Sequence, residues 1–351
     1  MSWIERWSPE LRAVAELSRC APGPGPASCD RDRLVACAVR ERTAAIVAHS
    51  VDDPRLRALA DAVLARQVLA LTQAAVLVSR IGPDVIPLKG LHLIETHYRP
   101  GERDLGDLDI LVRRERAAEA DAAIRALGYE AEVAASTVLG ATGSCLNSAI
   151  YRRGGDFHVH LHWHVVNASL PLSMVRIRAE EIWEESTPGT VAGIPARRMA
   201  PHHLLVTLCE HALKHSYDAL IHVADIDRAW RAGADADLAF GAARRWGIEP
   251  ALRWGLYFAK EILGTPVDVR APAGALERWV ARWVREDRRW PGLGAVGYLS
   301  MARGWRERAG FVRGSFAPPR RDVEGFGKRA GPWNVARRIW AALRAMRVGA
   351  R

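Results

Sequence analysis

The sequence predicts an α+β protein, in which a small mixed sheet with helices precedes a largely helical C-terminal region. Between residues 53 and 81 the apolar side chains recur with the period of a helix. Two later segments, 107–112 and 157–165, alternate in the way that is typical of strands. Beyond residue 200 the helical spacing returns. We therefore expect the strands in the middle of the chain, with helices on both sides of them.

Length and composition indicate a globular protein. The chain has 351 residues, 49% of them hydrophobic, and a formal net charge of +10, so it has room for two or three domains. It has no run of about twenty apolar residues that would predict a membrane span, and its first residues predict no signal peptide. The five cysteines are scattered and form no Cys-x-x-Cys pair, which favours a cytoplasmic location over structural zinc.

Composition shifts divide the chain into four predicted segments. Residues 1–52 form an N-terminal helical segment, with one helix to about residue 20 and a second from Asp30 to about His49. A sheet-containing domain follows at 53–200, then a helical domain at 201–270 and a basic helical region at 271–351. We expect the sheet domain to open with a long helix, which Pro54 starts and Gly82-Pro83 ends.

Asp107 and Asp109 lie two residues apart on a predicted strand, so both carboxylates point to the same face. Leu108, Ile110 and Val112 point the other way, into a core. Two adjacent carboxylates repel each other unless a cation lies between them, and a hard divalent ion such as Mg²⁺ suits them. The alternative from the residues alone is a solvated charge pair.

A short apolar strand at 85–88 ends in Lys89-Gly90 and leads into a helix. The chain has only four lysines, Lys89, Lys214, Lys260 and Lys328, and an ammonium group can act as a compact charge on a phosphate. Gly90 would let the backbone approach a phosphate, which a helix N-terminus also favours. The alternative is a surface or strand-end lysine.

Residues 147–165 predict a β-hairpin with its turn at Gly154-Gly155-Asp156. The second arm places four histidines on one face, which are His158, His160, His162 and His164. Imidazoles bind transition metals, so a dedicated metal site is one interpretation of this face. A role beside the two aspartates is the other.

These motifs together resemble a bacterial group of largely uncharacterised nucleotidyltransferases, within the superfamily that has the polymerase-beta-like palm. The matching positions are Leu88, Lys89, Gly90, Tyr98, Pro100, Arg103, Asp107 and Asp109. The resemblance covers about residues 55–230 and implies that 53–200 is a palm domain. It further implies transfer of NMP from an NTP to an acceptor, which could be a small molecule, a peptide, a protein or RNA.

The same resemblance implies roles for individual residues. Asp107 and Asp109 would hold Mg²⁺ or Mn²⁺, and Lys89, Gly90 and Arg103 would bind the triphosphate. The family carries an acidic residue before Leu-His-Trp, and here that position is His160. Either His160 takes the third catalytic position, or a nearby acid such as Asp156 substitutes, or the site binds nucleotide without turnover. Imidazole is a poor ligand for Mg²⁺, which predicts weakened or manganese-preferring chemistry.

Two regions further along the chain leave their roles open. His211, His215 and Asp225 match the family's downstream pattern, and they either pack structurally or line the substrate cleft. A helix is predicted over 294–309, then an extended segment to 332, then a basic amphipathic helix over 333–347 that docks on its own domain or binds an anionic surface. Two alternative functions remain. The missing third acid would suit a nucleotide-binding regulatory module, and the basic C-terminal region would suit a nucleic-acid-associated protein.

Overall fold

The computed structural model describes residues 7–22, 29–133, 135, 147–166, 176–285 and 293–316. Residues 134–146 are small and polar and include two glycines, which predicts a loop, and most of this segment lies outside the described residues. The same holds for the segment from 317 onward, including the predicted basic amphipathic helix at 333–347. The observed architecture is α+β, as the sequence predicts.

One five-stranded mixed sheet carries the aspartates, in the order β1-β2-β5-β4-β3. Strand β2 runs parallel to β5, and the other neighbours in the sheet run antiparallel. The bounds of these strands are β1 Ile86–Pro87, β2 Asp107–Leu111, β3 Glu130–Val133, β4 Ser148–Arg152 and β5 His158–His162. The predicted hairpin is therefore confirmed as β4 and β5. Its turn includes Gly155, whose positive φ of 83° suits glycine.

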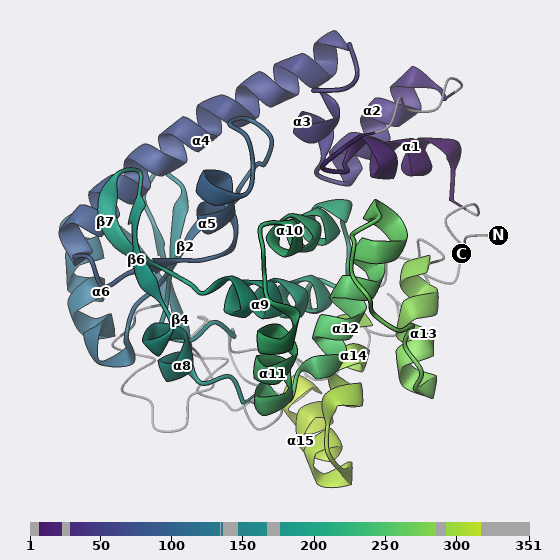
Figure 1. Ribbon diagram of the computed structural model, residues 1–351. Coiled ribbons are helices and arrows are strands. Elements are labelled where there is room, and N and C mark those ends of the chain that lie inside the picture. The colour runs from purple at the N-terminus through teal and green to yellow at the C-terminus, as the bar shows by residue number, and fades with distance from the viewer. Residues whose placement is uncertain are drawn as a thin grey trace.

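Helices α4, Pro54–Ile81, and α6, Ala117–Ala126, lie along one side of the sheet (Figure 1). Asp53 caps α4 by accepting a hydrogen bond from the Arg55 N–H at 2.9 Å. Among the described helices, α4 alone is long and apolar enough to cross a membrane, and 33% of that stretch is buried. Core helices of soluble proteins meet the same criterion, so we assign no membrane-spanning segment to it.

The two faces of β2 look into different cores. Leu108, Ile110 and Val112 pack in one core with the C-terminal half of α4 and with α6. Leu111, on the face of the aspartates, belongs to a second core that includes the N-terminal and C-terminal helices. Asp107 and Asp109 therefore face the helical part of the molecule. The predicted segment boundaries at 52, 200 and 270 stay predictions.

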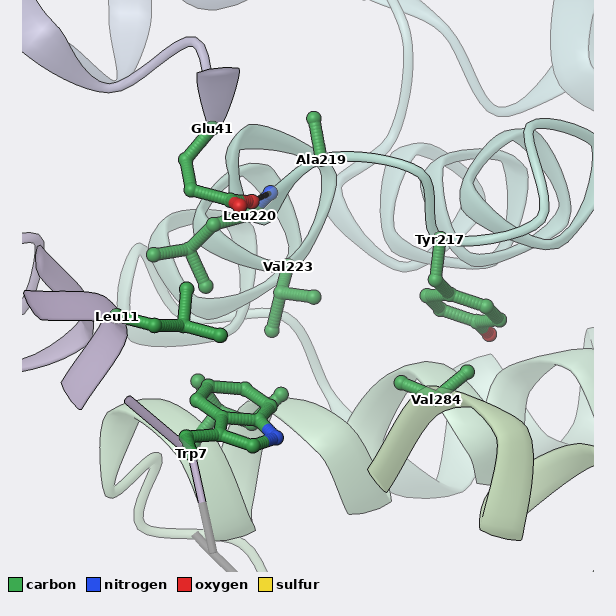
Figure 2. Close-up of a pocket in the computed structure, with 9 residues that line it drawn as sticks. Trp7, Leu11, Glu41, Tyr217, Ala219, Leu220, Val223 and Val284 are labelled. Carbon is green, nitrogen blue, oxygen red and sulfur yellow. Dashed lines mark hydrogen bonds between the residues drawn. The ribbon is translucent and has the colours of Figure 1, made fainter. Parts of the chain in front are cut away.

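The predicted second helix, Asp30 to His49, is wrong, because the chain breaks it into α2, Arg31–Arg40, and α3, Ala44–Val47. Arg42, in the break, takes a positive φ of 58°. Glu41 turns away to cap a later helix, and its carboxylate accepts a hydrogen bond from the Leu220 N–H at 2.8 Å. Figure 2 shows Glu41 beside Leu220, above a small pocket that Trp7, Leu11, Tyr217, Val223 and Val284 also line.

A hairpin extends the structure beyond β1. It is formed by β6, Thr187–Val191, and β7, Ile194–Arg198, after the short helix α8, Ala179–Glu184. Ala192 and Gly193, between its strands, both have positive φ, at 48° and 80°, as a tight hairpin turn requires. The Arg197 N–H donates to the Val85 carbonyl at 2.9 Å, so the hairpin lies next to β1.

Helices form most of the rest of the described chain. Helix α5, Lys89–Thr96, lies beside β2 and α4, whereas α9, Pro201–Lys214, and the helices after it lie on the opposite side of the molecule from α4 (Figure 1). The bounds of all these helices are α1 Pro9–Leu17, α5 Lys89–Thr96, α9 Pro201–Lys214, α10 Leu220–Arg231, α11 Ala236–Trp246, α12 Glu249–Phe258, a π-helical turn at Ala259–Leu263, α13 Ala275–Arg285, α14 Leu293–Met301 and α15 Trp305–Phe316. The predicted single helix over 294–309 is wrong, and so is the extended conformation predicted for 310–316, which belongs to α15; residues 317–332 of that predicted segment lie outside the described residues. The chain breaks at 302–304, where the Glu307 carboxylate accepts from the Arg303 N–H at 2.6 Å and starts α15.

Candidate active site

Strand pairing brings Asp109 next to His160. Strands β2 and β5 are parallel, with Asp109 opposite His160 and Asp107 opposite His158. His160 Nδ1 lies 3.2 Å from Asp107 Oδ2 and 3.7 Å from Asp109 Oδ1. The strand alternation that the sequence predicts for both segments is confirmed, and it gathers two carboxylates and an imidazole on one face.

Lys89 reaches the same group from the start of α5. Its Nζ donates to Asp109 Oδ1 at 2.7 Å, and its backbone has a positive φ of 44°. A non-glycine residue in this region is strained, and such strain is concentrated at functional sites. Burial lowers the pKa of Lys89, but the negative charges of Asp109 and Asp107 outweigh burial and raise it. Lys89 is therefore a charged ammonium group beside the aspartates.

His162 is a site residue whose contact sequence reasoning missed. It is fully buried, and its Nε2 lies 2.7 Å from Asp109 Oδ1. Burial lowers the pKa of His162 to about 4, so the ring is neutral at pH 7 and its Nε2–H donates to the carboxylate. The available signal was its position two residues after His160, on the same strand face.

The pKa values of the two aspartates shift in opposite directions. Burial raises the pKa of Asp109, but Lys89 and His162 outweigh burial and hold it well below the usual value. Burial and the charge of Asp109 raise the pKa of Asp107. The negative charge of Asp109 therefore makes the ionisation of Asp107 less favourable. A cation between the two carboxylates would remove this penalty.

Gly90 and Arg103 pack against each other. A Cβ on Gly90 would lie 2.7 Å from Arg103 Nη1, so only glycine lets the guanidinium group come this close. Arg103 Nε and Nη2 donate to Asp225 Oδ1 and Oδ2 at 2.8 and 2.7 Å, and Tyr98 Oη donates to Asp225 Oδ1 at 2.7 Å. Arg103 is thus engaged by Asp225 of α10, and its predicted contact with a triphosphate stays a prediction.

Helix α9 faces Lys89 with further charged groups. Burial and the charge of Lys89 lower the pKa of Lys214, and burial and Lys89 likewise lower that of His211. These effects place the end of α9 within electrostatic reach of Lys89. The His215 ring lies 4.4 Å from that of His211, centroid to centroid. Sequence reasoning assigns no role to Lys214, although it is one of only four lysines in the chain.

The donor set fits a divalent metal ion. Asp109, His160 and His162 each have one possible ligand atom within 4.8 Å of the others. Because His162 already donates its Nε2–H to Asp109, the candidate ligands are Asp109, His160 and the adjacent Asp107. The side chains of Asp107 and His160 are 37% and 23% exposed, so an ion could reach them from solvent. Carboxylate oxygens suit Mg²⁺, and the added imidazole suits Mn²⁺ or Zn²⁺ better.

We compared the chain with family models, curated proteins and solved structures. A family described as uncharacterised nucleotidyltransferases matches residues 27–264. No curated protein and no solved structure matches. The family match covers more than half of the chain and includes all the motif residues between Leu88 and Asp109. The resemblance in the sequence is therefore confirmed, and the chain belongs to this family of nucleotidyltransferases.

Proposed function

We propose that this protein is a metal-dependent enzyme that transfers NMP from an NTP to an unidentified acceptor. In this reaction an acceptor oxygen bonds to the α-phosphorus, the bond from that phosphorus to the β-phosphate breaks, and pyrophosphate leaves. The observation that carries the proposal is the cluster of Asp107, Asp109, His160 and Lys89 on one face of the sheet.

In this proposal Asp107 and Asp109 hold the metal and His160 completes the site. A bound divalent ion would neutralise phosphate charge and lower the pKa of the acceptor hydroxyl. Asp109 is kept ionised by Lys89 and by the His162 N–H, so it is ready to bind a cation. His162 itself acts as a positioning residue, because its Nε2–H is directed at Asp109.

Lys89 and Lys214 are the groups that we propose for the triphosphate. Both are ammonium groups, and the charge of Lys89 lowers the pKa of Lys214, which reflects repulsion that a polyanion between them would relieve. Arg103 is less suited, because it is 7% exposed and already bound to Asp225. Its proposed role is to fix the Lys89-Gly90 turn from behind.

Calorimetry tests the proposed site before any acceptor is known. Each NTP is titrated into the wild-type protein with Mg²⁺ or Mn²⁺, and then into an Asp107→Asn/Asp109→Asn variant. We expect metal-dependent binding that the double variant loses. Asp52→Asn is the matched control, because the Asp52 side chain is 85% exposed and pairs with Arg57 at the start of α4, so this variant should leave binding unchanged. If no NTP binds with either metal, or if the double variant binds as well as wild type, the assignment fails.

His160 also favours a second candidate, a nucleotide-binding module with weakened catalysis, since it stands where the family carries an acid. The variant His160→Asp separates the two candidates. If catalysis is limited by this ligand, we expect Mg²⁺-dependent transfer from labelled NTP to rise, by about tenfold or more, toward the rate with Mn²⁺. An unchanged preference for Mn²⁺ over Mg²⁺ would argue that His160 is not a ligand. Binding without transfer in both proteins would support the regulatory module.

A further inference from the structure

A second group of metal-binding side chains lies away from the aspartates. Glu185 follows α8, and His202 and His203 belong to the first turn of α9. Each offers one ligand atom, and these atoms lie within 4.8 Å of one another. His202 Nε2 is 3.0 Å from Glu185 Oε2, and His203 Nε2 is 3.8 Å from Glu185 Oε1. Both imidazoles therefore converge on one carboxylate.

His203 lacks any other use for its polar atoms. It is fully buried, and neither ring nitrogen has a hydrogen-bond partner among the described residues. Its ring stacks on Trp246 of α11, with the centroids 4.8 Å apart. Buried polar groups without partners are rare and costly. A ligand bond from Nε2 would satisfy one of the two nitrogens, in the direction of Glu185.

We propose that Glu185, His202 and His203 form a second metal site, which takes Zn²⁺ or a similar divalent transition metal. Two imidazoles and one carboxylate are typical zinc ligands, and the fourth position would stay open to water. The two imidazole nitrogens lie 3.0 Å from Oε2 and 3.8 Å from Oε1 of the same carboxylate, and ligand atoms at normal zinc distances in a tetrahedron are roughly 3.3 Å apart, so small side-chain shifts would bring them to a zinc ion. Mg²⁺ is disfavoured, because it prefers oxygen ligands.

The proposed metal would join α8 to α9, and α11 packs against one of its ligands. Glu185 closes α8, the two histidines begin α9, and Trp246 ends α11 against His203. At 1.5 Å per residue, His203 lies about 16 Å from Lys214 along α9, so this site is separate from the proposed NTP site. Glu185 has 45% of its side chain exposed, which gives the ion a route from solvent.

Another histidine group suits a cation less well. His215, Asp218 and His222 also have ligand atoms within 4.8 Å of one another. Here His222 Nε2 is 3.0 Å from Asp218 Oδ1, and neither histidine of the group has both ring nitrogens buried without a partner, as His203 has. Burial lowers the pKa of His215, and the positive charges of Lys214 and Lys89 lower it further, so these two lysines would also repel a metal ion. The proposal therefore rests on Glu185, His202 and His203.

Cobalt binding tests the proposal independently of nucleotidyl transfer. The full-length Asp107→Asn/Asp109→Asn/His160→Asn protein, in which the three ligands of the proposed NTP site are removed, is stripped with chelator and titrated with Co²⁺. Visible absorption reports tetrahedral cobalt. We expect one equivalent to bind, and we expect Glu185→Gln in the same background to weaken binding by at least about tenfold. His203→Phe, which keeps an aromatic ring on Trp246, should do the same.

His215→Gln is the matched control, because it removes an imidazole from the other group, and it should leave the cobalt spectrum unchanged. Absence of a cobalt spectrum in the background protein would overturn the proposal. So would a spectrum that persists unchanged in Glu185→Gln and His203→Phe, and its loss in His215→Gln would then assign the cobalt to the other histidine group. Glu185 is partly exposed, so circular dichroism should show its variant folded and the loss of cobalt attributable to the ligand.

Discussion

Two buried carboxylates, Asp109 and Asp225, each contact one basic side chain and one further hydrogen-bond donor, but the donors are distributed differently over the two oxygens. Asp225 uses both oxygens, with Arg103 on each and Tyr98 on one. Asp109 receives Lys89 and His162 on a single oxygen, Oδ1. Arg103 is fixed by its forked geometry, whereas the Lys89 ammonium is a mobile point charge. The first pair is satisfied, and the second has ligand capacity left.

This difference distinguishes an ion pair that stabilises the fold from an ion pair whose carboxylate can still bind a cation. The Arg103–Asp225 pair is 8% and 2% exposed and ties the segment before β2 to α10. The Lys89 side chain is 20% exposed and sits on strained backbone next to Asp107, whose pKa is raised. A cation that displaced Lys89 Nζ would relieve the aspartates. The displaced ammonium would then be free for a phosphate.

Loss of the Asp109 charge should have the largest effect, and it should be on activity. If Asp109 holds the metal, Asp109→Asn removes several kcal/mol of transition-state stabilisation, which is roughly three orders of magnitude in rate. The amide keeps an acceptor for Lys89 and His162, so the free energy of unfolding should fall by only about 1–3 kcal/mol. Transfer from α-labelled NTP and urea denaturation measure the two effects. Turnover equal to wild type would refute the metal-binding role.

Loss of the Arg103 charge should reverse this pattern. Arg103→Met leaves Asp225 buried at 1% exposure without its cation, and such uncompensated charges cost about 3–5 kcal/mol. The double variant Arg103→Met/Asp225→Leu removes both charges and should regain most of the loss. Urea denaturation of the three proteins checks this. If the double variant is as unstable as the single one, the pair is not what stabilises this contact.

Gly90→Ala should have an intermediate effect, because Gly90 follows Lys89 in the chain and packs against Arg103, so it contacts both ion pairs. The new methyl group would lie 2.7 Å from Arg103 Nη1 and 3.2 Å from Leu105 Cβ. Arg103 cannot move freely while Asp225 holds it, so we expect a loss of about 1–3 kcal/mol. Gly106→Ala is the control, since a Cβ there meets nothing within 4 Å. Equal stability of the two variants would mean that Arg103 adapts without cost.

Much of the sheet could be predicted from the sequence because its signals are local. The alternation in 107–112 and 157–165 correctly gave strands, the shared face of Asp107 and Asp109, and the histidine face beside them. The ends of α4 followed from Pro54 and Gly82. The family motif then related these strands to one another.

The remaining features depend on contacts between distant segments. The break between α2 and α3 exists because Glu41 caps α10, 179 residues later. The His162 contact with Asp109 crosses 53 residues, and no spacing rule reveals which imidazole turns inward. Arg103 was matched to a phosphate role by its motif position, but its partner Asp225 lies 122 residues away. Sequence periodicity gives the faces of elements, and tertiary packing selects the partners.

The smallest expected effect concerns His92, which lies one turn after Lys89 on α5 and is 5% exposed. Burial lowers the pKa of His92 to about 3, from an ordinary value of 6.5. In the unfolded chain His92 therefore takes up a proton below about pH 6.5, whereas in the folded protein it does so only below about pH 3. The contribution of the neutral His92 to the free energy of unfolding is fully present above pH 6.5 and is lost as the pH falls. At pH 6 the free energy of unfolding is lower by about 0.8 kcal/mol for this reason. Urea denaturation at pH 7.5 and pH 6 should show that His92→Phe loses less stability than wild type, by that amount. An equal loss in both proteins would mean that His92 becomes protonated without unfolding.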